Sequence, residues 1–268
     1  MTIAAEKSLT TAADPLVRCD QDARGVLTLT LNRPQAFNAL SEAMLAALQR
    51  ELDAIASDES VRVVVLAAEG KAFCAGHDLK EMRAQPSLDY YRGLFAQCTR
   101  MMLTLRRLPV PVIARVQGIA TAAGCQLVAQ CDLAVASSAA KFAVSGVNLG
   151  LFCSTPSVPL SRNVARKQAF EMLVTGDFID AAQAQARGLV NRVVEPAGLD
   201  AEIETLAASI VAKPRAVVAM GKELFYRQAE LGIEAAYDAA GETMACNMMD
   251  AAALEGVQAF IEKRKPRW

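Results

Sequence analysis

The sequence predicts an α/β fold with parallel strands, followed by a region made of helices only. Two observations favour this fold. In the first part of the chain, short apolar runs typical of strands alternate with longer runs of helical periodicity, and glycine-rich turns follow the strands. After Gly198 only helical patterns remain. We therefore expect a flexible tail over residues 1–17, a core over 18–197 and a C-terminal helical region over 198–268.

The first part of the core alternates strand and helix patterns. Residues 25–31 alternate apolar with small polar side chains, which is typical of a half-buried strand. Ser41 is a suitable N-cap for an amphipathic helix that extends to about Ile55. Residues 61–66 are rich in valine and predict a buried strand.

The same order of elements then repeats. Residues 88–108 have the pattern of a long helix, which Pro109 ends. We also expect strands at 112–117, 133–136 and 141–144, and a helix of small residues at 121–130. The predicted C-terminal helices span residues 199–212, 214–229, 233–249 and 251–263. No glycine- or serine-rich linker precedes them, so we expect them to pack on the core or on a neighbouring subunit.

The composition excludes several classes of protein. The 28 basic and 29 acidic residues nearly cancel, which argues against nucleic acid and against an anionic membrane as partners. A single histidine and seven cysteines without a CxxC pair lead us to expect no metal site. No apolar run is long enough to span a membrane, and residues 1–15 lack the pattern of a targeting segment. We therefore predict a cytoplasmic protein, and its 53% hydrophobic content favours an oligomer.

Two turns with small residues carry the chemistry. Residues 75–78 (Ala-Gly-His-Asp) follow a buried strand and precede a short helix, and residues 122–126 (Ala-Ala-Gly-Cys-Gln) have the same setting. Backbone N–H groups at such turns can bind negative charge that develops on an oxygen atom. Each turn alone is equally compatible with an ordinary strand–turn–helix connection. Because the turns lie in neighbouring units, they can converge on one carbonyl oxygen.

Several segments match one family pattern in order: 31–34 with 38–40, 72–79, 118–125, 131–134, 170–176, 181–190 and 260–264. On these segments the chain resembles the crotonase superfamily, also called the enoyl-CoA hydratase/isomerase family, over roughly residues 20–268. Each segment is a weak signal, but their combination in this order is specific. The resemblance implies a crotonase-like core of ββα turns wound as a spiral, a C-terminal helical region involved in oligomer contacts, and a homotrimer or dimer of trimers.

The resemblance also implies a substrate and a site. The substrate is an acyl-CoA thioester, so coenzyme A is part of the substrate and no separate cofactor is expected. The backbone N–H groups of His77 and Ala123 correspond to the oxyanion hole. Phe260 and Lys263 match C-terminal positions that contact CoA, sometimes from a neighbouring subunit. The residues expected to contact CoA are Ala36, Ala75, His77, Asp78, Leu79, Lys80, Gly124, Phe260 and Lys263.

The chain departs from the family pattern where acid–base chemistry is expected. A hydratase of this family uses two glutamates, and the matching positions here hold Gln126 and Gly146. A glutamine can orient water but cannot take its proton near neutral pH, and glycine has no side chain. General acid–base assistance contributes about 10²–10⁴-fold per group. We therefore expect a poor or inactive two-glutamate hydratase.

Other side chains near the hole remain candidates. The His77 ring is one, although its backbone N–H is the expected functional part. Cys153 lies in a loop that faces the acyl group in relatives, and the alternative is a small buried core thiol. Tyr90 or Tyr91 can line the acyl pocket or simply pack. The lesser polar candidates are Asn148 and Ser145.

Three functions stay open at this stage. The first is an acyl-CoA enzyme, a lyase or isomerase of fatty acid metabolism, that works through the oxyanion hole with a base not visible in the sequence. The second is a decarboxylase-like or thioesterase-like enzyme, since residues 76–78 and 147–150 resemble a decarboxylase branch of the family. Against that branch, the tyrosine expected soon after Gly150 is Cys153. The third is a non-catalytic acyl-CoA-binding protein.

Overall fold

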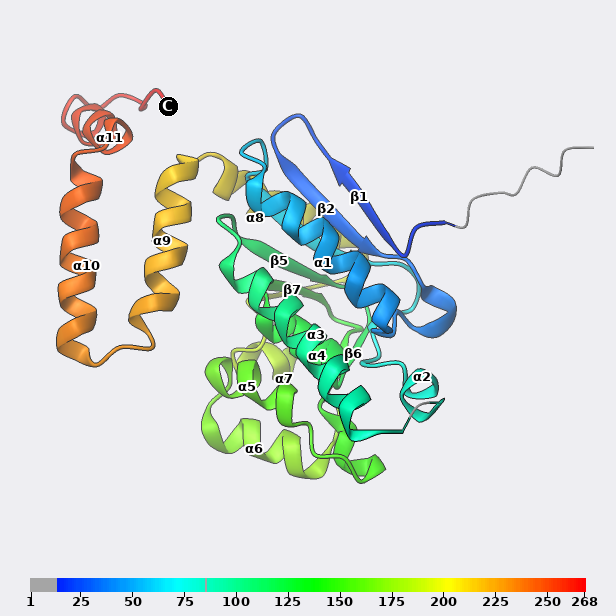
Figure 1. Cartoon of the computed structure of the whole chain (residues 1–268). Helices are drawn as coiled ribbons and strands as arrows, with labels where there is room; N and C mark the ends of the chain where they lie inside the picture. The colour runs from blue at the N-terminus through cyan, green and yellow to red at the C-terminus, as the bar shows by residue number, and fades with distance from the viewer. Residues whose placement is uncertain (1–13, 85) are drawn as a thin grey trace, which may run out of the picture.

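Two sheets form the centre of the computed structural model, which describes residues 14–84 and 86–268 (Figure 1). The larger sheet has the strand order β1-β2-β3-β5-β7-β10, and all neighbours are parallel except β1 and β2. Its strands are β1 (Val17–Gln21), β2 (Val26–Leu31), β3 (Val63–Ala68), β5 (Val112–Val116), β7 (Leu133–Ser137) and β10 (Arg192–Val194). The predicted α/β fold with parallel strands is confirmed.

The strands that follow β3, β5 and β7 in the chain belong to a smaller sheet. Its order is β4-β6-β8-β9, and β4, β6 and β8 are mutually parallel. Its strands are β4 (Ala72–Cys74), β6 (Ile119–Thr121), β8 (Lys141–Ala143) and β9 (Ile179–Asp180). Because β4, β6 and β8 follow β3, β5 and β7 in the chain, each unit adds one strand to each sheet. The carboxyl ends of β4, β6 and β8 therefore lie side by side.

Helices surround and fill the two sheets. Helices α1 and α3 pack against each other (Figure 1), and Ser41 caps α1 as predicted, since its Oγ accepts a hydrogen bond from Met44 N–H. The remaining helices of the core connect and cover the sheets. The bounds are η1 (Pro34–Ala36), α1 (Glu42–Ser57), α2 (Leu79–Ala84), α3 (Leu88–Arg107), α4 (Ala123–Gln130), η2 (Ser145–Leu149), α5 (Ser154–Asn163), α6 (Arg166–Thr175), α7 (Ala181–Ala186) and η3 (Pro196–Gly198), where η marks a 3-10 helix.

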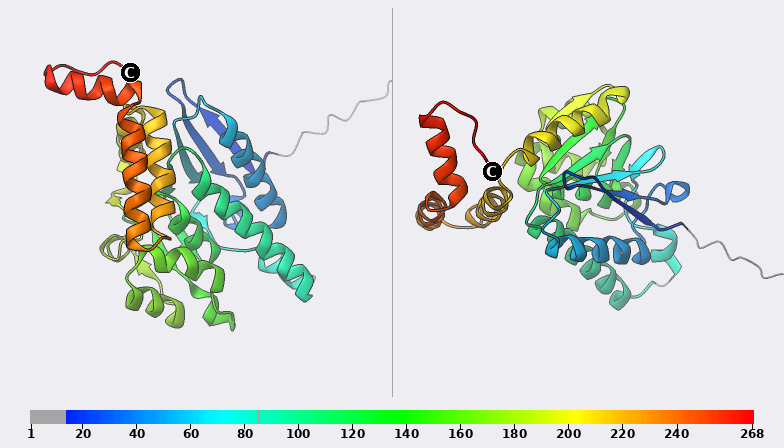
Figure 2. Two further views of the ribbon diagram at one scale, coloured as in Figure 1. Left: turned by 60° about the vertical axis from the view of Figure 1, so that its left-hand side comes forward. Right: turned by 90° about the horizontal axis from the view of Figure 1, so that it is seen from above.

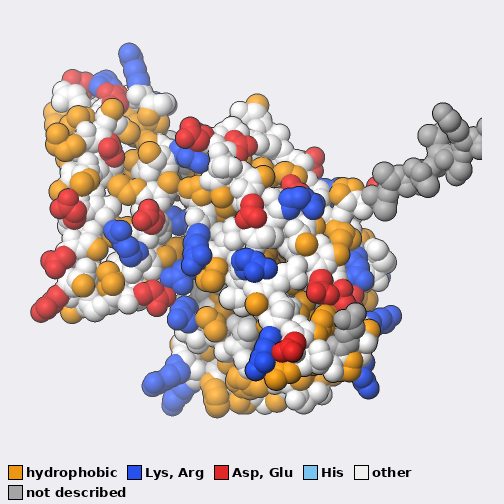
Figure 3. Space-filling view, viewed as in Figure 1, with side chains coloured by type: hydrophobic (Ala, Val, Ile, Leu, Met, Phe, Trp, Pro, Cys, Tyr) orange, Lys and Arg blue, Asp and Glu red, His pale blue; other side chains and the backbone are white. Residues whose placement is uncertain are grey.

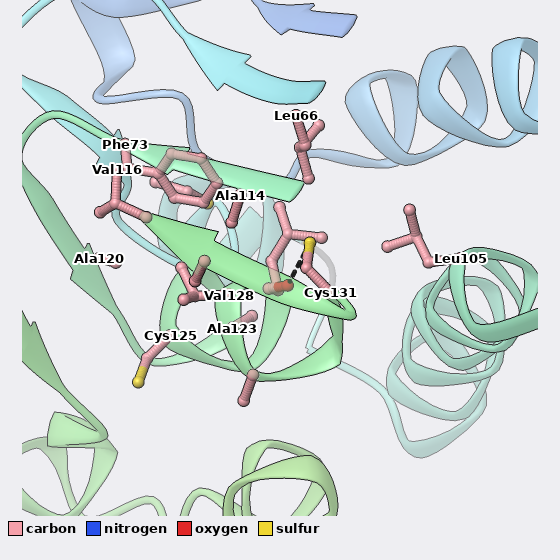
Figure 4. Close-up of a cluster of buried hydrophobic side chains, with 14 of the residues drawn as sticks. Leu66, Phe73, Leu105, Ala114, Val116, Ala120, Ala123, Cys125, Val128 and Cys131 are labelled. Atoms are coloured by element: carbon pink, nitrogen blue, oxygen red, sulfur yellow. Dashed lines mark hydrogen bonds between the residues drawn. The ribbon is translucent and has the colours of Figure 1, made fainter. Parts of the chain in front are cut away.

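Helix α4 lies inside the core, and every residue from Ala123 to Ala129 is buried. Its small side chains allow close packing against β4, β6 and α5. Figure 4 shows part of the surrounding cluster, with Phe73 of β4 and Ala120 of β6. Just after the helix, Cys131 Sγ donates a hydrogen bond to the Leu127 carbonyl at 3.2 Å. The helix that starts at the second turn is therefore packed against both β4 and β6 of the smaller sheet.

Several short strands were not predicted from the sequence. Strand β1 was not predicted, and it begins at Val17, which is buried in the core. The rest of the predicted tail lies mostly outside the described residues. Strands β4 and β6 have three residues each and lie inside segments that were interpreted as turns.

The first helix of the C-terminal region belongs to the core. Leu199, Ile203 and Ala207 of α8 (Leu199–Val211) pack on the larger sheet against a cluster that includes Val65 and Ile113. The other three helices are α9 (Arg215–Gln228), α10 (Ile233–Met248) and α11 (Ala251–Ile261). These three form an arm beside the core (Figures 1 and 2).

One buried polar cluster fixes α9 to the core. Lys222 Nζ lies 2.7 Å from Asp132 Oδ2, and the Tyr226 hydroxyl donates to Asp132 Oδ1 at 2.7 Å. Lys222 also donates to the carbonyls of Leu105 and Val110. Farther out, α10 and α11 expose large apolar side chains, and these gather on the arm (Figure 3). In the part of the chain that the structure describes, no helix has the length and apolar character to cross a membrane.

Candidate oxyanion-binding site

The two turns identified in the sequence pack directly against each other. Gly76 has a φ of +93°, a conformation that side chains rarely adopt. A Cβ placed on Gly76 would lie 3.0 Å from Ala122 Cβ, 3.2 Å from the Thr121 carbonyl oxygen and 3.3 Å from the Ala123 nitrogen. A Cβ on Gly124 would overlap the Cys74 carbonyl. Both glycines therefore allow the second turn to sit against the end of β4.

Two backbone N–H groups are free at this junction. Ala123 is the first residue of α4, so its N–H has no acceptor within the helix. Ala122 before it has an unusual φ of 50° and donates its own N–H to the Ala143 carbonyl. Among the hydrogen bonds that join the loops of residues 14–84 and 86–268, neither Ala123 N–H nor His77 N–H donates. The N-terminal end of α4 adds a favourable field for negative charge.

Asn38 holds the first turn from behind. It is fully buried, and its Nδ2 donates to the carbonyls of Glu69 (2.8 Å) and Ala72 (2.9 Å). Its Oδ1 accepts a hydrogen bond from Arg33 N–H. In the sequence, residues 38–40 indicate only a family landmark, so this role was missed. Its single sequence signal is an asparagine close after the Asn-Arg-Pro segment.

Asp78 forms an ion pair and two hydrogen bonds within the protein. Its Oδ2 lies 2.8 Å from Arg33 Nη1, and its Oδ1 accepts hydrogen bonds from the N–H groups of Lys80 and Glu81. Burial opposes ionisation of Asp78, but the hydrogen bonds from Arg33 and Glu81 outweigh it, so the pKa of this carboxyl lies below its ordinary value. The carboxylate thus fixes the start of α2 immediately after the His77 turn.

The His77 side chain is half-buried, and its ring lies against Leu40 and Phe95. Its Nδ1 lies 3.2 Å from the Leu40 carbonyl, which can only accept, so Nδ1 carries the proton. Burial lowers the pKa of the ring, although the hydrogen bond to Leu40 acts in the opposite direction. Phe95 packs edge-on, with ring centres 5.6 Å apart. Nε2 is a buried acceptor without a partner in the described part of the chain.

The two positions of the missing glutamates differ from each other. Gln126 is 5% exposed, and its Oε1 is buried without a hydrogen-bond partner among the described residues. A Cβ on Gly146 would lie 2.5 Å from the Leu151 carbonyl oxygen and 2.8 Å from Cys153 Sγ. The site therefore has room for an acid at 126, whereas the loop at 151–153 fills the place where a side chain at 146 would begin.

Cys153 is a packed thiol. Its Sγ accepts a hydrogen bond from Gly146 N–H at 3.3 Å, and burial raises the pKa of the thiol. A thiol is a nucleophile only as the thiolate, so this environment disfavours catalysis by Cys153. The geometry favours the alternative of a small core thiol.

The remaining candidates fall into two groups. Tyr91 donates its hydroxyl to the Met82 carbonyl at 3.1 Å and ties α3 to α2, whereas the Tyr90 hydroxyl is buried and has no partner in the described chain. Asn148 Nδ2 donates a hydrogen bond to the Gly176 carbonyl at 3.4 Å. Ser145 Oγ lies 2.9 Å from Thr121 Oγ1, a residue that the sequence analysis did not single out.

The residues expected to contact CoA divide between two regions. Ala36 and Ala75 lie beside the first turn, since the Phe37 carbonyl accepts the Ala75 N–H, and Leu79 and Lys80 are exposed on α2. Phe260, on α11, is 85% exposed. Helix α11 lies at the outer end of the arm, far from α2 in every view (Figures 1 and 2). A single chain therefore does not bring Phe260 and Lys263 to the turns.

The family model described as Enoyl-CoA hydratase/isomerase matches residues 21–268. The chain belongs to this family. The resemblance to the crotonase superfamily is thereby confirmed. The described residues contain no group of three or more His, Cys, Asp or Glu side chains that could hold a metal ion.

Solved structures of family members superpose closely on the chain. An enoyl-CoA hydratase structure from Mycobacterium smegmatis is 71% identical with a TM-score of 0.94, covering 95% of this chain and 99% of that one. The structure of human enoyl Coenzyme A hydratase domain-containing protein 3 is 44% identical with a TM-score of 0.91, covering 94% of this chain and all of that one (100%). The crotonase fold is therefore shared along nearly the whole chain.

Two vertebrate relatives carry the name of the same family and are named as mitochondrial. The mitochondrial enoyl-CoA hydratase domain-containing protein 3 of Xenopus laevis is 47% identical over 92% of this chain and 84% of the relative. The human protein of that name is 45% identical over 91% of this chain and 80% of the relative. Both names include "mitochondrial", so the predicted cytoplasmic location gains no support from these relatives.

Proposed function

We propose that this family member is an acyl-CoA thioester-binding enzyme that polarises the thioester carbonyl through His77 N–H and Ala123 N–H. The observation that carries the proposal is the contact between the two turns, where neither N–H group has an acceptor among the described residues. Two such donors stabilise an enolate-like or tetrahedral oxyanion. The substrate carries the CoA, so no further cofactor is required.

The same site supports only poor hydration by two carboxylates. Gln126 cannot accept a proton from water, and Gly146 is closed off by Leu151 and Cys153. The His77 ring is a weak substitute base because its pKa is lowered. The proposed enzyme therefore relies on stabilising negative charge rather than on removing a proton with a strong base.

A decarboxylase-like activity is the second candidate. Loss of CO₂ from a malonyl-type thioester leaves an enolate, which the two N–H groups would stabilise without a general base. The neutral Gln126 at the position of the first acid favours this reaction over hydration, because a carboxylate there would repel the substrate's own carboxylate.

We further propose a homotrimer or dimer of trimers. Phe260 and Lys263 lie away from the turns of their own chain, so a neighbouring subunit must supply them if they contact CoA. The arm also exposes Ile233, Tyr237 and Met249, each by more than 70%. Apolar patches of this kind are typical of subunit interfaces. Two vertebrate relatives are named as mitochondrial, whereas the 71% identical structure comes from the bacterium Mycobacterium smegmatis, so the relatives' names do not assign a mitochondrial location to this chain.

The test is turnover of crotonyl-CoA, malonyl-CoA, methylmalonyl-CoA and butyryl-CoA by the purified protein, with sedimentation to measure the assembly. We expect thioester binding, slow hydration of crotonyl-CoA and a trimeric or hexameric mass. Hydration at rates normal for the family, abolished in Gln126→Ala, would overturn the proposal. Release of CO₂ from a malonyl ester would select the second candidate, and binding without any turnover would identify a non-catalytic acyl-CoA-binding protein.

A further inference from the structure

The side-chain amide of Gln117 joins the two units that carry the turns. Gln117 lies between β5 and β6, in the unit of the second turn. Its Nε2 lies 2.8 Å from the Ala68 carbonyl oxygen and 3.2 Å from the carbonyl oxygens of both Gly70 and Ala72. These three carbonyls belong to the segment from the end of β3 to the start of β4. One amide nitrogen thus ties the second unit to the strand that leads into the first turn.

The surroundings fix which way this amide points. The three carbonyls can only accept, so the NH₂ group and not Oε1 faces them. Because the NH₂ group has two protons for three acceptors, it has no capacity left for another group. Oε1 is buried and has no hydrogen-bond partner among the described residues. An unpaired buried acceptor opposes folding, so stability alone does not account for a glutamine at this position.

A second amide donates to one of the same carbonyls. The Ala72 carbonyl also accepts a hydrogen bond from Asn38 Nδ2, at 2.9 Å. Ala72 is the first residue of β4, and Asn38 belongs to the unit of the first turn. A Cβ on Gly118, next to Gln117, would lie 2.0 Å from the Lys71 carbonyl oxygen. The start of β4 is therefore held by one amide from each unit and lies directly against the backbone that follows Gln117.

The start of β4 sets the position of the oxyanion donors. Strands β4 and β6 pair with an irregular register, in which two steps along β4 match one step along β6. The first turn directly follows β4, and the second turn directly follows β6. If β4 started at another point against β6, His77 N–H would move relative to Ala123 N–H. The segment that Gln117 holds therefore controls the separation of the two donors.

We propose that Gln117 is a positioning residue, which sets the separation of the His77 and Ala123 N–H groups for a thioester oxygen. The proposal rests on the proposed function, because that function gives the separation its catalytic meaning. The alternative is a purely structural link between the units. A structural link changes only stability, whereas a positioning residue also changes how strongly the bound carbonyl is polarised. A displacement of about 1 Å can reduce the rate about 10²-fold.

The test replaces the amide by a side chain of similar shape that cannot donate. Gln117→Met is compared with the wild type by the infrared stretch of bound butyryl-CoA that carries ¹³C at the thioester carbon. Both proteins are also compared by kcat and KM for the fastest wild-type substrate among crotonyl-, malonyl-, methylmalonyl- and butyryl-CoA. We expect a smaller shift of the stretch to low frequency, and a fall in kcat of about 10–10²-fold with a change in KM below about 3-fold. Urea denaturation establishes that the variant is folded under the assay conditions.

Two further variants complete the test. Gln117→Glu can donate only while its carboxyl group is protonated, and the three nearby carbonyls favour the protonated form. The shift of the stretch in this variant should be present at about pH 6 and lost at about pH 9, whereas that of the wild type should be the same at both. This comparison within one protein decides the question if Gln117→Met does not fold. Gln185→Met is the matched control, because the Gln185 amide donates to a single carbonyl, that of Asn191 at 3.2 Å, and the change should affect neither the stretch nor kcat.

The adverse outcomes separate this proposal from the proposed function. A folded Gln117→Met protein with the stretch and kcat of the wild type, or one in which only KM rises, overturns the role of Gln117. A stretch in Gln117→Glu that is the same at both pH values does so too. If butyryl-CoA does not bind to the wild type, or binds with the stretch that it has in water, the proposed function fails and this proposal fails with it.

Discussion

Gly76→Ala separates the stability of the turn from its function. The new Cβ would approach Ala122 Cβ to 3.0 Å and the Ala123 nitrogen to 3.3 Å. A left-handed backbone conformation costs an alanine about 1–2 kcal/mol, and the contact with Ala122 adds to this. Since the Cβ also covers one donor, kcat should fall about 10²–10³-fold, the effect of losing an oxyanion-hole donor.

Urea denaturation measures the first effect, and turnover of the preferred thioester measures the second. Gly93→Ala is the matched control, because a Cβ on this helix α3 residue meets nothing within 4 Å. That change should stabilise the protein by about 0.5–1 kcal/mol and leave turnover unchanged. A folded Gly76→Ala protein with the turnover of the wild type would refute the assignment of these turns to the oxyanion hole.

Three further predictions follow from the site and its supports. Gln126→Glu should raise crotonyl-CoA hydration by about 10²-fold or more, whereas Gly146→Glu should lower the melting temperature without restoring activity, because Leu151 and Cys153 occupy its space. Burial lowers the pKa of His77, so the stability that its neutral ring contributes is complete above the ordinary value of 6.5 and is lost as the pH falls through the lower pKa of the folded protein. Because the sequence has a single histidine, NMR can follow it directly and should show no titration near pH 6.5. Lys222→Met removes the positive charge beside Asp132, which keeps only its hydrogen bonds from the Tyr226 hydroxyl and Val112 N–H, and should lower the unfolding free energy in urea by about 3 kcal/mol; a change below about 1 kcal/mol would contradict the anchoring role.

The long elements of the fold could be predicted because their patterns are long. Helices α1 and α3 show helical periodicity over 16 and 20 residues, and their predicted bounds are within two residues of the observed ones. Strands β4 and β6, of three residues each, were missed because they lie inside segments that were interpreted as turns, whereas the equally short β8 was predicted at 141–144. Yet these strands set the positions of both turns, so the sheet that builds the site was the least visible part of the sequence.

The positions of the turns could be predicted, but their surroundings could not. Small residues after apolar runs indicate Gly76 and Ala123, and the family resemblance pairs them. The clamp by Asn38 joins segments more than 30 residues apart, and no local pattern reports such a contact. The same holds for the loop that closes the space beside Gly146 and for the contact between Thr121 and Ser145.

The structure distinguishes the two positions at which the family's glutamates are absent. Gln126 and Gly146 look equivalent as substitutions, but only Gln126 leaves a side chain with a free polar atom in the site. At Gly146 the backbone itself contacts its neighbours, so the second acid cannot be restored by a point mutation. The two positions therefore differ in what a point mutation can restore.

The most direct test of the oxyanion hole is the infrared carbonyl stretch of butyryl-CoA labelled with ¹³C at the thioester carbon. Hydrogen bonds from His77 and Ala123 N–H would polarise the bound carbonyl. We predict a shift of the stretch to lower frequency on binding to the wild type, and loss of that shift in Gly76→Ala. A bound thioester whose stretch is the same as in water, or a shift that persists in Gly76→Ala, would contradict the central claim.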